Sequence, residues 1–426
     1  MLFNTLDSWL SWQENLYTST IALGLDRVKA VLSRLGTGPL PYLVITVGGT
    51  NGKGSCIALL DAILRAAGYL VGTYTSPHLV RYNERIRING IDADDITLCH
   101  AFNRIESARN SQSLTYFEFG TLAALEMFRV AKVDIALLEV GLGGRLDAVN
   151  VIDADAALVV SVDIDHVEWL GSDRNSIGYE KAGIYRTGRP AICADPNPPR
   201  SLLEHVGILS AHLRQVGRDY KFAHTGETWC WFNEIFRLED LPLPALLGNQ
   251  QLGNAAAVIE TISSLRKQLT VYPDAIREGL LRVKLPGRFQ IFPGPVEWIL
   301  DVAHNPNAAK VLANNLKMHN HHGRTIAVTG ILADKDASGI IIELADFVDH
   351  WCTATLSGPR GRTSIELANT LQQAVGTQIT ICNDVFTACR SAQSNAQPGD
   401  RIVVFGSFHT VAPVLVAQPW NSLITF

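Results

Sequence analysis

A glycine-rich turn between an apolar strand and a helical segment constrains the fold of this chain more than any other feature. The turn lies in VITVGGTNGKGSC, residues 44–56. The apolar run at 42–47 predicts a short buried strand, and SCIALLDAILRAAGY after the turn has the apolar spacing of a helix that stops at Gly68. The first N–H groups and the dipole of such a helix bind phosphate. The sequence therefore predicts an α/β fold with a phosphate-binding loop.

The loop differs from the common pattern G-x-x-x-x-G-K-[ST], in which the hydroxyl residue follows the lysine directly. Here Gly54 follows Lys53, Ser55 comes one place late, and Val47 stands where the first glycine is expected. A purely structural turn is the alternative. We favour phosphate binding, because the turn holds a lysine between a strand and a helix start.

Strands and helices alternate along most of the chain. The runs VDIALLEVGLGG and DAALVVSVDIDH read as strands, with the helical pattern EFGTLAALEMFRVA before them. This alternation predicts a parallel sheet covered on both faces, with ligands at the carboxyl ends of its strands. A proline- and glycine-rich stretch at 284–298 interrupts it, so we expect two domains, 1–287 and 288–426. Residues 196–247 carry no assignable motif, and their alternating aromatic and polar residues predict an antiparallel ribbon.

Composition excludes several classes of protein. The formal charge of −5 argues against nucleic acid as the main partner, and no apolar run approaches the ~18 residues of a membrane span. The first 17 residues hold no basic side chain, which is unlike a signal peptide. The seven scattered cysteines fit reduced thiols, and His319, His321 and His322 fit a solvated loop better than a metal site. We expect a cytoplasmic enzyme.

The predicted strand ends supply two oxygen ligands and an imidazole. Glu139 lies in an apolar strand, where a divalent cation would balance its charge, while Ser76 ends the second strand and His166 closes the strand VVSVDIDH. Oxygen ligands suit Mg²⁺, and an imidazole is unusual for it. A salt bridge at Glu139 and a loop-capping role for His166 remain equal alternatives. The spacing of Lys181 favours an exposed helical lysine.

Nine motifs together resemble the bifunctional dihydrofolate synthase/folylpolyglutamate synthase family. This family is a branch of the Mur ligase superfamily of ATP-dependent amide-bond-forming enzymes. The resemblance covers residues 10–412. The phosphate loop of this family has its serine in the same late position, one residue further from the lysine than in the common pattern. It implies a Mur-ligase-like central domain with a mainly parallel sheet and a smaller Rossmann-like C-terminal α/β domain. The motifs are GTNGKGS, SPHLVRYNERIRING, LTYFEFGTLAALE, LEVGLGGRLDAVN, DHVEWLG, EKAGIYR, LPGRFQ, DVAHNP and GSFHTV.

The resemblance also implies roles for individual residues. It implies that Lys181 is a carbamylated lysine (N6-carboxylysine), formed with CO₂, and that its carbamate helps to place a metal. The resemblance therefore reverses the expectation from spacing that Lys181 is an exposed helical lysine. Two Mg²⁺ ions are expected on Ser76, Glu139 and His166. His304, Ser407 and His409 are expected to handle glutamate or phosphate. The positions implied for ATP are Gly52, Lys53, Gly54, Ser55, Asn254, Arg288 and Asp301, and those implied for catalysis are Lys53, Lys181, His166 and His304.

Three segments match a dihydropteroate site in the bifunctional members of the family. Two aromatic residues in the second segment can stack on a flat pterin or aminobenzoate ring, and plain core packing is the equal alternative. The segments are Ile21, Ala22 and Leu23; Thr115, Tyr116, Phe117 and Glu118; and Leu146, Asp147 and Ala148.

The expected reaction is ATP-dependent condensation of L-glutamate onto 7,8-dihydropteroate, and of further glutamates onto reduced folates, through an acyl phosphate. We expect a monomer that acts on these small molecules and binds neither nucleic acid nor membrane. The alternatives are a Mur enzyme with a nucleotide-sugar substrate, a folylpolyglutamate synthase without dihydropteroate activity, a P-loop kinase or GTPase, and a catalytically silent nucleotide- or folate-binding protein.

Overall fold

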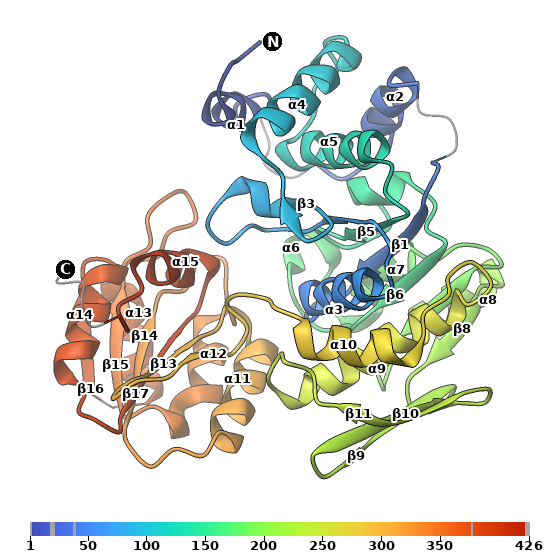
Figure 1. Ribbon diagram of the computed structural model, residues 1–426. Coiled ribbons are helices and arrows are strands. Elements are labelled where there is room, and N and C mark those ends of the chain that lie inside the picture. Colours follow the sequence, from blue (N-terminus) through green and yellow to red (C-terminus); the bar gives the residue numbers. More distant parts are fainter. Residues whose placement is uncertain (1, 18–21, 37–39, 376–377, 422–426) are drawn as a thin grey trace. The chain divides into compact units, whose positions relative to one another are not determined.

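The computed structural model describes residues 2–17, 22–36, 40–375 and 378–421 of the chain. It forms two compact units (Figure 1). The first unit comprises Met1–Ala245 and Gln251–Lys284, and the second comprises Leu246–Gln250 and Leu285–Phe426. None of the helices in the described residues is long and apolar enough to cross a membrane.

An eight-stranded sheet forms the centre of the first unit, in the order β4-β3-β2-β5-β1-β6-β7-β8. The six strands from β2 to β8 in this order run parallel, and β3 and β4 are added antiparallel at one edge. The predicted mainly parallel sheet is confirmed. The strands are β1 (Leu43–Gly48), β2 (Val71–Tyr74), β3 (Ile86–Ile88), β4 (Ile91–Asp92), β5 (Ile135–Glu139), β6 (Ala156–Val159), β7 (Pro190–Cys193) and β8 (His212–Gln215).

Helices cover both faces of this sheet (Figure 1). Four helices on one face enclose an aromatic core that includes Trp9, Phe102 and Phe119. They are α1 (Leu6–Glu14), α2 (Asp26–Arg34), α4 (Asp95–Arg109) and α5 (Tyr116–Ala131). On the other face lie α3 (Lys53–Ala66), α9 (Asn249–Ser264) and α10 (Pro273–Arg282). The remaining helices of the unit are η1 (Tyr82–Arg85), η2 (Ala148–Val151), α6 (Val167–Leu170), α7 (Arg174–Ala182) and α8 (Arg200–Leu209).

A separate three-stranded antiparallel sheet follows β8. Its strands are β9 (Tyr220–Thr225), β10 (Thr228–Asn233) and β11 (Arg237–Pro242), with β10 in the middle. The predicted antiparallel ribbon is therefore confirmed. Trp229 and Trp231 on β10 are fully buried, so this sheet has its own apolar face.

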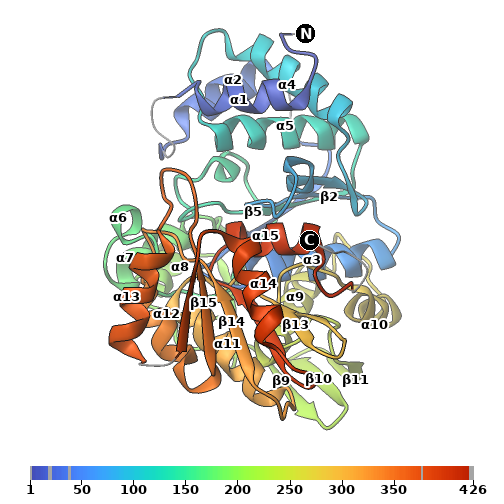
Figure 2. The same ribbon diagram turned by 90° about the vertical axis from the view of Figure 1, so that its left-hand side faces the viewer.

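The second unit is a smaller α/β fold with a six-stranded sheet in the order β12-β13-β17-β14-β15-β16. All strands except β12 are parallel, as predicted for a Rossmann-like domain. Helices α11, α12 and α13 cover one face, and α14 and α15 the other (Figure 2). The strands are β12 (Gln290–Phe292), β13 (Glu297–Leu300), β14 (Thr325–Thr329), β15 (His350–Ala354), β16 (Gln378–Cys382) and β17 (Arg401–Phe405). The helices are α11 (Pro306–Met318), α12 (Ala337–Leu344), η3 (Ala345–Phe347), α13 (Ser364–Ala374), α14 (Val385–Asn395) and α15 (Phe408–Ala417).

Candidate active site

The phosphate loop joins β1, near the middle of the sheet, to the start of α3. Gly52, the residue before the helix, has a φ of +87°, which a residue with a side chain rarely adopts. A Cβ on Gly52 would lie 2.8 Å from Val160 Cγ1 and 3.1 Å from Asn254 Oδ1. The glycine is therefore required both by the turn and by the packing around it.

Hydrogen bonds to the segment after β6, from backbone N–H groups to a carbonyl and two hydroxyls, fix the shape of the loop. The N–H of Thr50 donates to the carbonyl of Ser161 at 2.9 Å, and the N–H of Asn51 donates to the Ser161 hydroxyl at 3.0 Å. The N–H of Asp163 donates to the Thr50 hydroxyl at 2.9 Å. The loop is thus held in a defined conformation by its own unit.

The Lys53 ammonium lies back over the loop. Its Nζ donates to the carbonyl oxygens of Gly49 at 2.9 Å and Thr50 at 3.2 Å. Both acceptors are neutral, and an anionic phosphate oxygen is a stronger acceptor for an ammonium. This arrangement suits a lysine that binds the outer phosphates of a nucleotide.

Two amide side chains of α9 lie against the loop. Asn254 contacts Gly52 and donates from Nδ2 to Gln251 Oε1 at 2.9 Å. Gln251 Nε2 lies 3.5 Å from Ser55 Oγ, at the limit of a hydrogen bond. Asn254 was expected from the resemblance. Gln251 was not, because an amide distant in sequence carries no local motif.

Ser76 and Glu139 meet at the ends of two neighbouring strands, two residues after β2 and at the last residue of β5. The N–H of Ser76 donates to Glu139 Oε2 at 3.2 Å, and Glu139 is only 6% exposed. Hydroxyl and carboxylate oxygens are ligands that Mg²⁺ accepts, together with several waters. The side chains present therefore fit a divalent cation. No cluster of three or more His, Cys, Asp or Glu in the described part of the chain has metal-binding geometry.

His166 does not end a strand, so that part of the prediction is wrong. β6 ends at Val159, and His166 precedes the short helix α6 with a φ of +51°, an uncommon conformation for a residue with a side chain. Residues 161–165 make loop and side-chain contacts in place of further ladder bonds, such as the bond from Val162 N to Asp195 Oδ2. His166 Nε2 lies 3.9 Å from Asp165 Oδ2.

Lys181 lies inside the first unit, on α7, and is only 3% exposed. The spacing-based expectation of an exposed lysine is wrong. Burial and the nearby Lys53 charge lower its pKa to about 7, while Asp165 acts in the opposite direction. Gly144 lets the backbone approach closely, since a Cβ there would lie 2.8 Å from the Glu180 carbonyl oxygen. Lys181 is therefore a desolvated amine beside the phosphate loop.

The three expected dihydropteroate segments lie together. The N–H of Gly24, directly after the first segment, donates to the carbonyl of Leu146 at 3.2 Å. The ring of Phe117 lies 5.6 Å from that of Tyr74 and packs on Gly141, and the ring of Tyr116 meets Tyr82 edge-on. Ile21 and the preceding Thr20 lie outside the described residues.

Asp147 is a buried carboxylate in the third segment. Its carboxylate accepts from the N–H groups of Leu142 at 2.8 Å and Val149 at 3.0 Å. Burial nevertheless raises its pKa to about 7, and the Lys53 charge opposes that rise. The Lys53 charge thus acts on the pKa of both Asp147 and Lys181.

The candidate residues of the second unit lie just before β12, after β13 and after β17. Asp301 accepts from the N–H groups of Phe289 and Ala303, both at 2.8 Å, and burial raises its pKa while Arg288 opposes the rise. The Arg288 guanidinium lies 5.3 Å from the centre of the Phe408 ring, and the His304 ring lies 6.2 Å from it. Phe408 was not predicted, because an aromatic residue at a helix start resembles core packing.

Two further expected residues lie at the start of α15. The Ser407 hydroxyl accepts from the N–H of His409 at 3.1 Å and so caps the helix. His304 Nδ1 lies 2.9 Å from the Val302 carbonyl oxygen. Among these side chains, Arg288, Asp301 and His304 are therefore brought close together within the second unit.

Comparison with known proteins agrees with this architecture. Residues 287–408 match the model of the Mur ligase, glutamate ligase domain. The fold is a Mur-ligase-like α/β fold in two units.

Relatives of similar length extend the match to nearly the whole chain. The Escherichia coli K12 protein named dihydrofolate synthase/folylpolyglutamate synthase is 45% identical over 411 residues, covering 96% of this chain and 94% of that one. The Haemophilus influenzae protein of the same name is 42% identical, with 96% of each covered. The chain belongs to the dihydrofolate synthase/folylpolyglutamate synthase family, and the resemblance seen in the sequence is confirmed.

Solved structures of related proteins share the fold over almost all residues. A structure of E. coli FolC in complex with DHPP and ADP has a TM-score of 0.93 at 44% identity, covering 98% of each chain. A bifunctional folylpolyglutamate synthase/dihydrofolate synthase with Mn, AMPPNP and L-glutamate bound has a TM-score of 0.89 at 44% identity, again covering 98% of each chain.

Proposed function

We propose that this protein is an ATP-dependent ligase that joins L-glutamate to 7,8-dihydropteroate and adds further glutamates to reduced folates. The observation that carries the proposal is the arrangement around Lys53. Lys53 donates to a carbonyl of the formed phosphate loop. Its charge also acts on the pKa of two buried groups, Asp147 of the expected pterin segments and Lys181. Relatives matched over nearly their full length carry the name of this activity.

In the proposed reaction the substrate carboxylate attacks the γ-phosphorus of ATP, an O–P bond forms, and ADP leaves. The glutamate amine then attacks the acyl carbon, and a tetrahedral intermediate collapses with loss of phosphate and of the amine proton. No side-chain nucleophile is needed, so catalysis depends on positioning and on charge neutralisation. Lys53 would exchange its two loop carbonyls for γ-phosphate oxygens.

Ser76 and Glu139 are the residues that we expect to hold a divalent metal, with His166 beside them. Bound there, Mg²⁺ supplies neutralisation of the charge on the phosphoryl group. The Ser76–Glu139 contact and the burial of that carboxylate support this assignment. We expect two ions, in keeping with the family.

Lys181 is proposed to carry a carbamate. With a pKa of about 7, part of its amine is neutral at physiological pH. The neutral nitrogen attacks CO₂, an N–C bond forms and one proton is released, which leaves an anion. That anion would help to place a metal and would remove the repulsion between the charges of Lys181 and Lys53.

Residues of both units are proposed to bind the substrates. We assign the first domain, 1–287, to the phosphates and the pterin, and the second, 288–426, to glutamate and the rest of the nucleotide. Asn254 lies against the phosphate loop, which supports a nucleotide contact. Arg288 and Asp301 are assigned to the nucleotide, and His304, Ser407 and His409 to glutamate or phosphate. We propose that the chain acts as a monomer.

The test is ADP release by the purified chain with ATP, Mg²⁺, L-glutamate and dihydropteroate, with dihydrofolate measured as product. We expect turnover that stops when any one component is omitted. Turnover with tetrahydrofolate but not with dihydropteroate would reduce the function to folylpolyglutamate synthesis. ATP hydrolysis that is independent of pteroate and glutamate would overturn the proposal.

A further inference from the structure

Arg27, the second residue of α2, makes three kinds of contact around the expected dihydropteroate segments. Its Nη2 donates to the carbonyl of Ala22 at 2.8 Å, and therefore holds the first segment. Its Nη2 and Nε donate to Glu118 Oε1 at 2.8 and 3.1 Å, and therefore hold the second segment. Its guanidinium also lies 5.4 Å from the centre of the Tyr17 ring. One side chain thus joins two of the three expected segments.

The Glu118 end of this contact is rigid. Glu118 is 3% exposed, and its Oε2 also accepts from the N–H of Thr115 at 2.8 Å. Thr115 in turn caps α5 by accepting from the N–H of Glu118. The carboxylate therefore belongs to the capping box of α5, and its position follows that of the helix. Arg27 is held at a point that cannot move independently of α5.

The Ala22 end of this contact belongs to a segment without regular structure. Residues 22–24 lie in no helix or strand, and their other described anchor is the bond from Gly24 N to Leu146 O, the third segment. A segment with so few backbone bonds keeps its conformation through side-chain contacts such as that of Arg27. Without them, the substrate would have to order this backbone when it binds, which weakens affinity.

We propose that Arg27 is a positioning residue for the acid substrate: it fixes residues 22–24 against the start of α5 and so sets the affinity for dihydropteroate. This inference rests on the proposed function. Arg27 touches neither ATP residues nor the expected metal ligands in its described contacts, so its effect should be confined to one substrate. The planar guanidinium matters, because it reaches a carboxylate and a carbonyl at the same time.

The test compares steady-state constants of the full-length wild type with those of Arg27→Met and Arg27→Lys. For Arg27→Met we expect the KM for dihydropteroate to rise by about tenfold or more, because ordering of the freed segment then opposes binding. The KM for ATP and kcat at saturation should stay within about threefold. Arg27→Lys should recover only part of the loss, because an ammonium lacks the forked geometry.

Two further variants separate positioning from simple instability. Arg27→Met leaves a buried carboxylate unpaired, so the double variant Arg27→Met/Glu118→Gln removes that charge while keeping an amide for the capping box. It should regain thermal stability and keep the high KM for dihydropteroate. The control is Arg129→Met, which breaks a bidentate pair with the buried Glu126 on the same helix and leaves Arg104 as the remaining partner of that carboxylate. It should lose stability with a normal KM.

Two results would overturn this inference and leave the proposed function standing, provided that the wild type makes dihydrofolate. One is an unchanged KM for dihydropteroate in a stable Arg27→Met variant. The other is an equal rise in the KM values for dihydropteroate and ATP. An equal rise in Arg129→Met would do the same, because it would trace the effect to lost stability. A wild-type chain that neither binds nor turns over dihydropteroate would overturn both this inference and the proposed function.

Discussion

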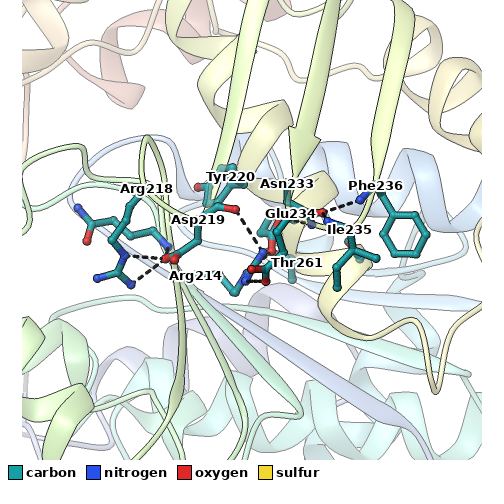
Figure 3. A network of polar contacts seen from close by, with 12 residues as sticks. Arg214, Arg218, Asp219, Tyr220, Asn233, Glu234, Ile235, Phe236 and Thr261 are labelled. Atoms are coloured by element: carbon teal, nitrogen blue, oxygen red, sulfur yellow. Dashed lines mark hydrogen bonds and ion pairs between the residues drawn. The ribbon is translucent and has the colours of Figure 1, made fainter.

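The phosphate loop and the three-stranded sheet β9–β11 are built in different ways within one unit. The loop is short in sequence, and its shape depends on glycine conformation and on backbone bonds to Ser161. The three-stranded sheet is attached through charged side chains from distant segments (Figure 3). Arg214 on β8 donates from Nε to Glu260 on α9 and from Nη1 to Glu234, both at 2.7 Å.

Burial makes this network important for stability. Glu260 is 1% exposed and also accepts from Asn233 Nδ2 at 3.1 Å. Burial raises its pKa, and Arg214 and Asn233 oppose that rise. A buried carboxylate that loses its partner is costly. The comparison suggests that changes in the loop should remove activity with little effect on stability, and that changes in the network should do the reverse.

Lys53→Ala gives the largest expected effect and tests the loop side of the comparison. Loss of the ammonium should lower kcat by about 10²–10³-fold, the range found when one preorganised charge-stabilising group is removed. The melting temperature should stay within about 2 °C, since the hydrogen bonds of the ammonium within the described residues go to two loop carbonyls. Measuring ADP release and thermal unfolding on one preparation checks this. Normal turnover in the folded variant would remove Lys53 from the site.

The activity of Lys181→Ala should also fall severely, by about tenfold or more, and small carboxylic acids that take the place of the carbamate should partly restore it.

The activity of the wild type should depend on CO₂ in a way that changes with pH. Because the pKa is about 7, the amine is mostly protonated at pH 6 and mostly neutral at pH 8. After CO₂ is removed, adding CO₂ back to the same dissolved concentration should therefore restore activity faster at pH 8. Full activity of Lys181→Ala without added acid would exclude the carbamate.

Arg214→Met tests the network side. It should lower the free energy of unfolding by about 3–5 kcal/mol, because Glu260 stays buried without its partner. The kcat at a temperature where the variant is folded should remain within about twofold. The double variant Arg214→Met/Glu260→Gln should recover part of the loss in urea unfolding. A large fall in kcat with unchanged stability would contradict the comparison.

Tyr220→Phe should have the smallest effect. The buried Tyr220 hydroxyl donates to the Cys193 carbonyl at 3.3 Å, which ties β9 to β7. Removing a single neutral hydrogen bond should cost about 0.5–1.5 kcal/mol of unfolding free energy, with no change in activity. A loss above about 3 kcal/mol would mean that this hydroxyl supports more of the sheet than its one bond indicates.

The same contrast explains what the sequence could predict. The loop, the parallel sheets and the antiparallel ribbon follow from local residue types and apolar periodicity, and all three are present in the structure. The burial of Lys181 does not follow from spacing, since it depends on the packing of the Gly144 turn against α7. The Arg27–Glu118 and Arg214–Glu260 pairs join residues far apart in sequence, so no local pattern contains them.

The bonds that hold Thr50 and Asn51 to Ser161 lie entirely within the first unit. Capture of ATP then needs the displacement of one lysine side chain and no folding of the loop itself. We expect the association rate to be set by diffusion and by the attraction between Lys53 and the phosphates. That rate should decrease as ionic strength rises, because salt screens the attraction.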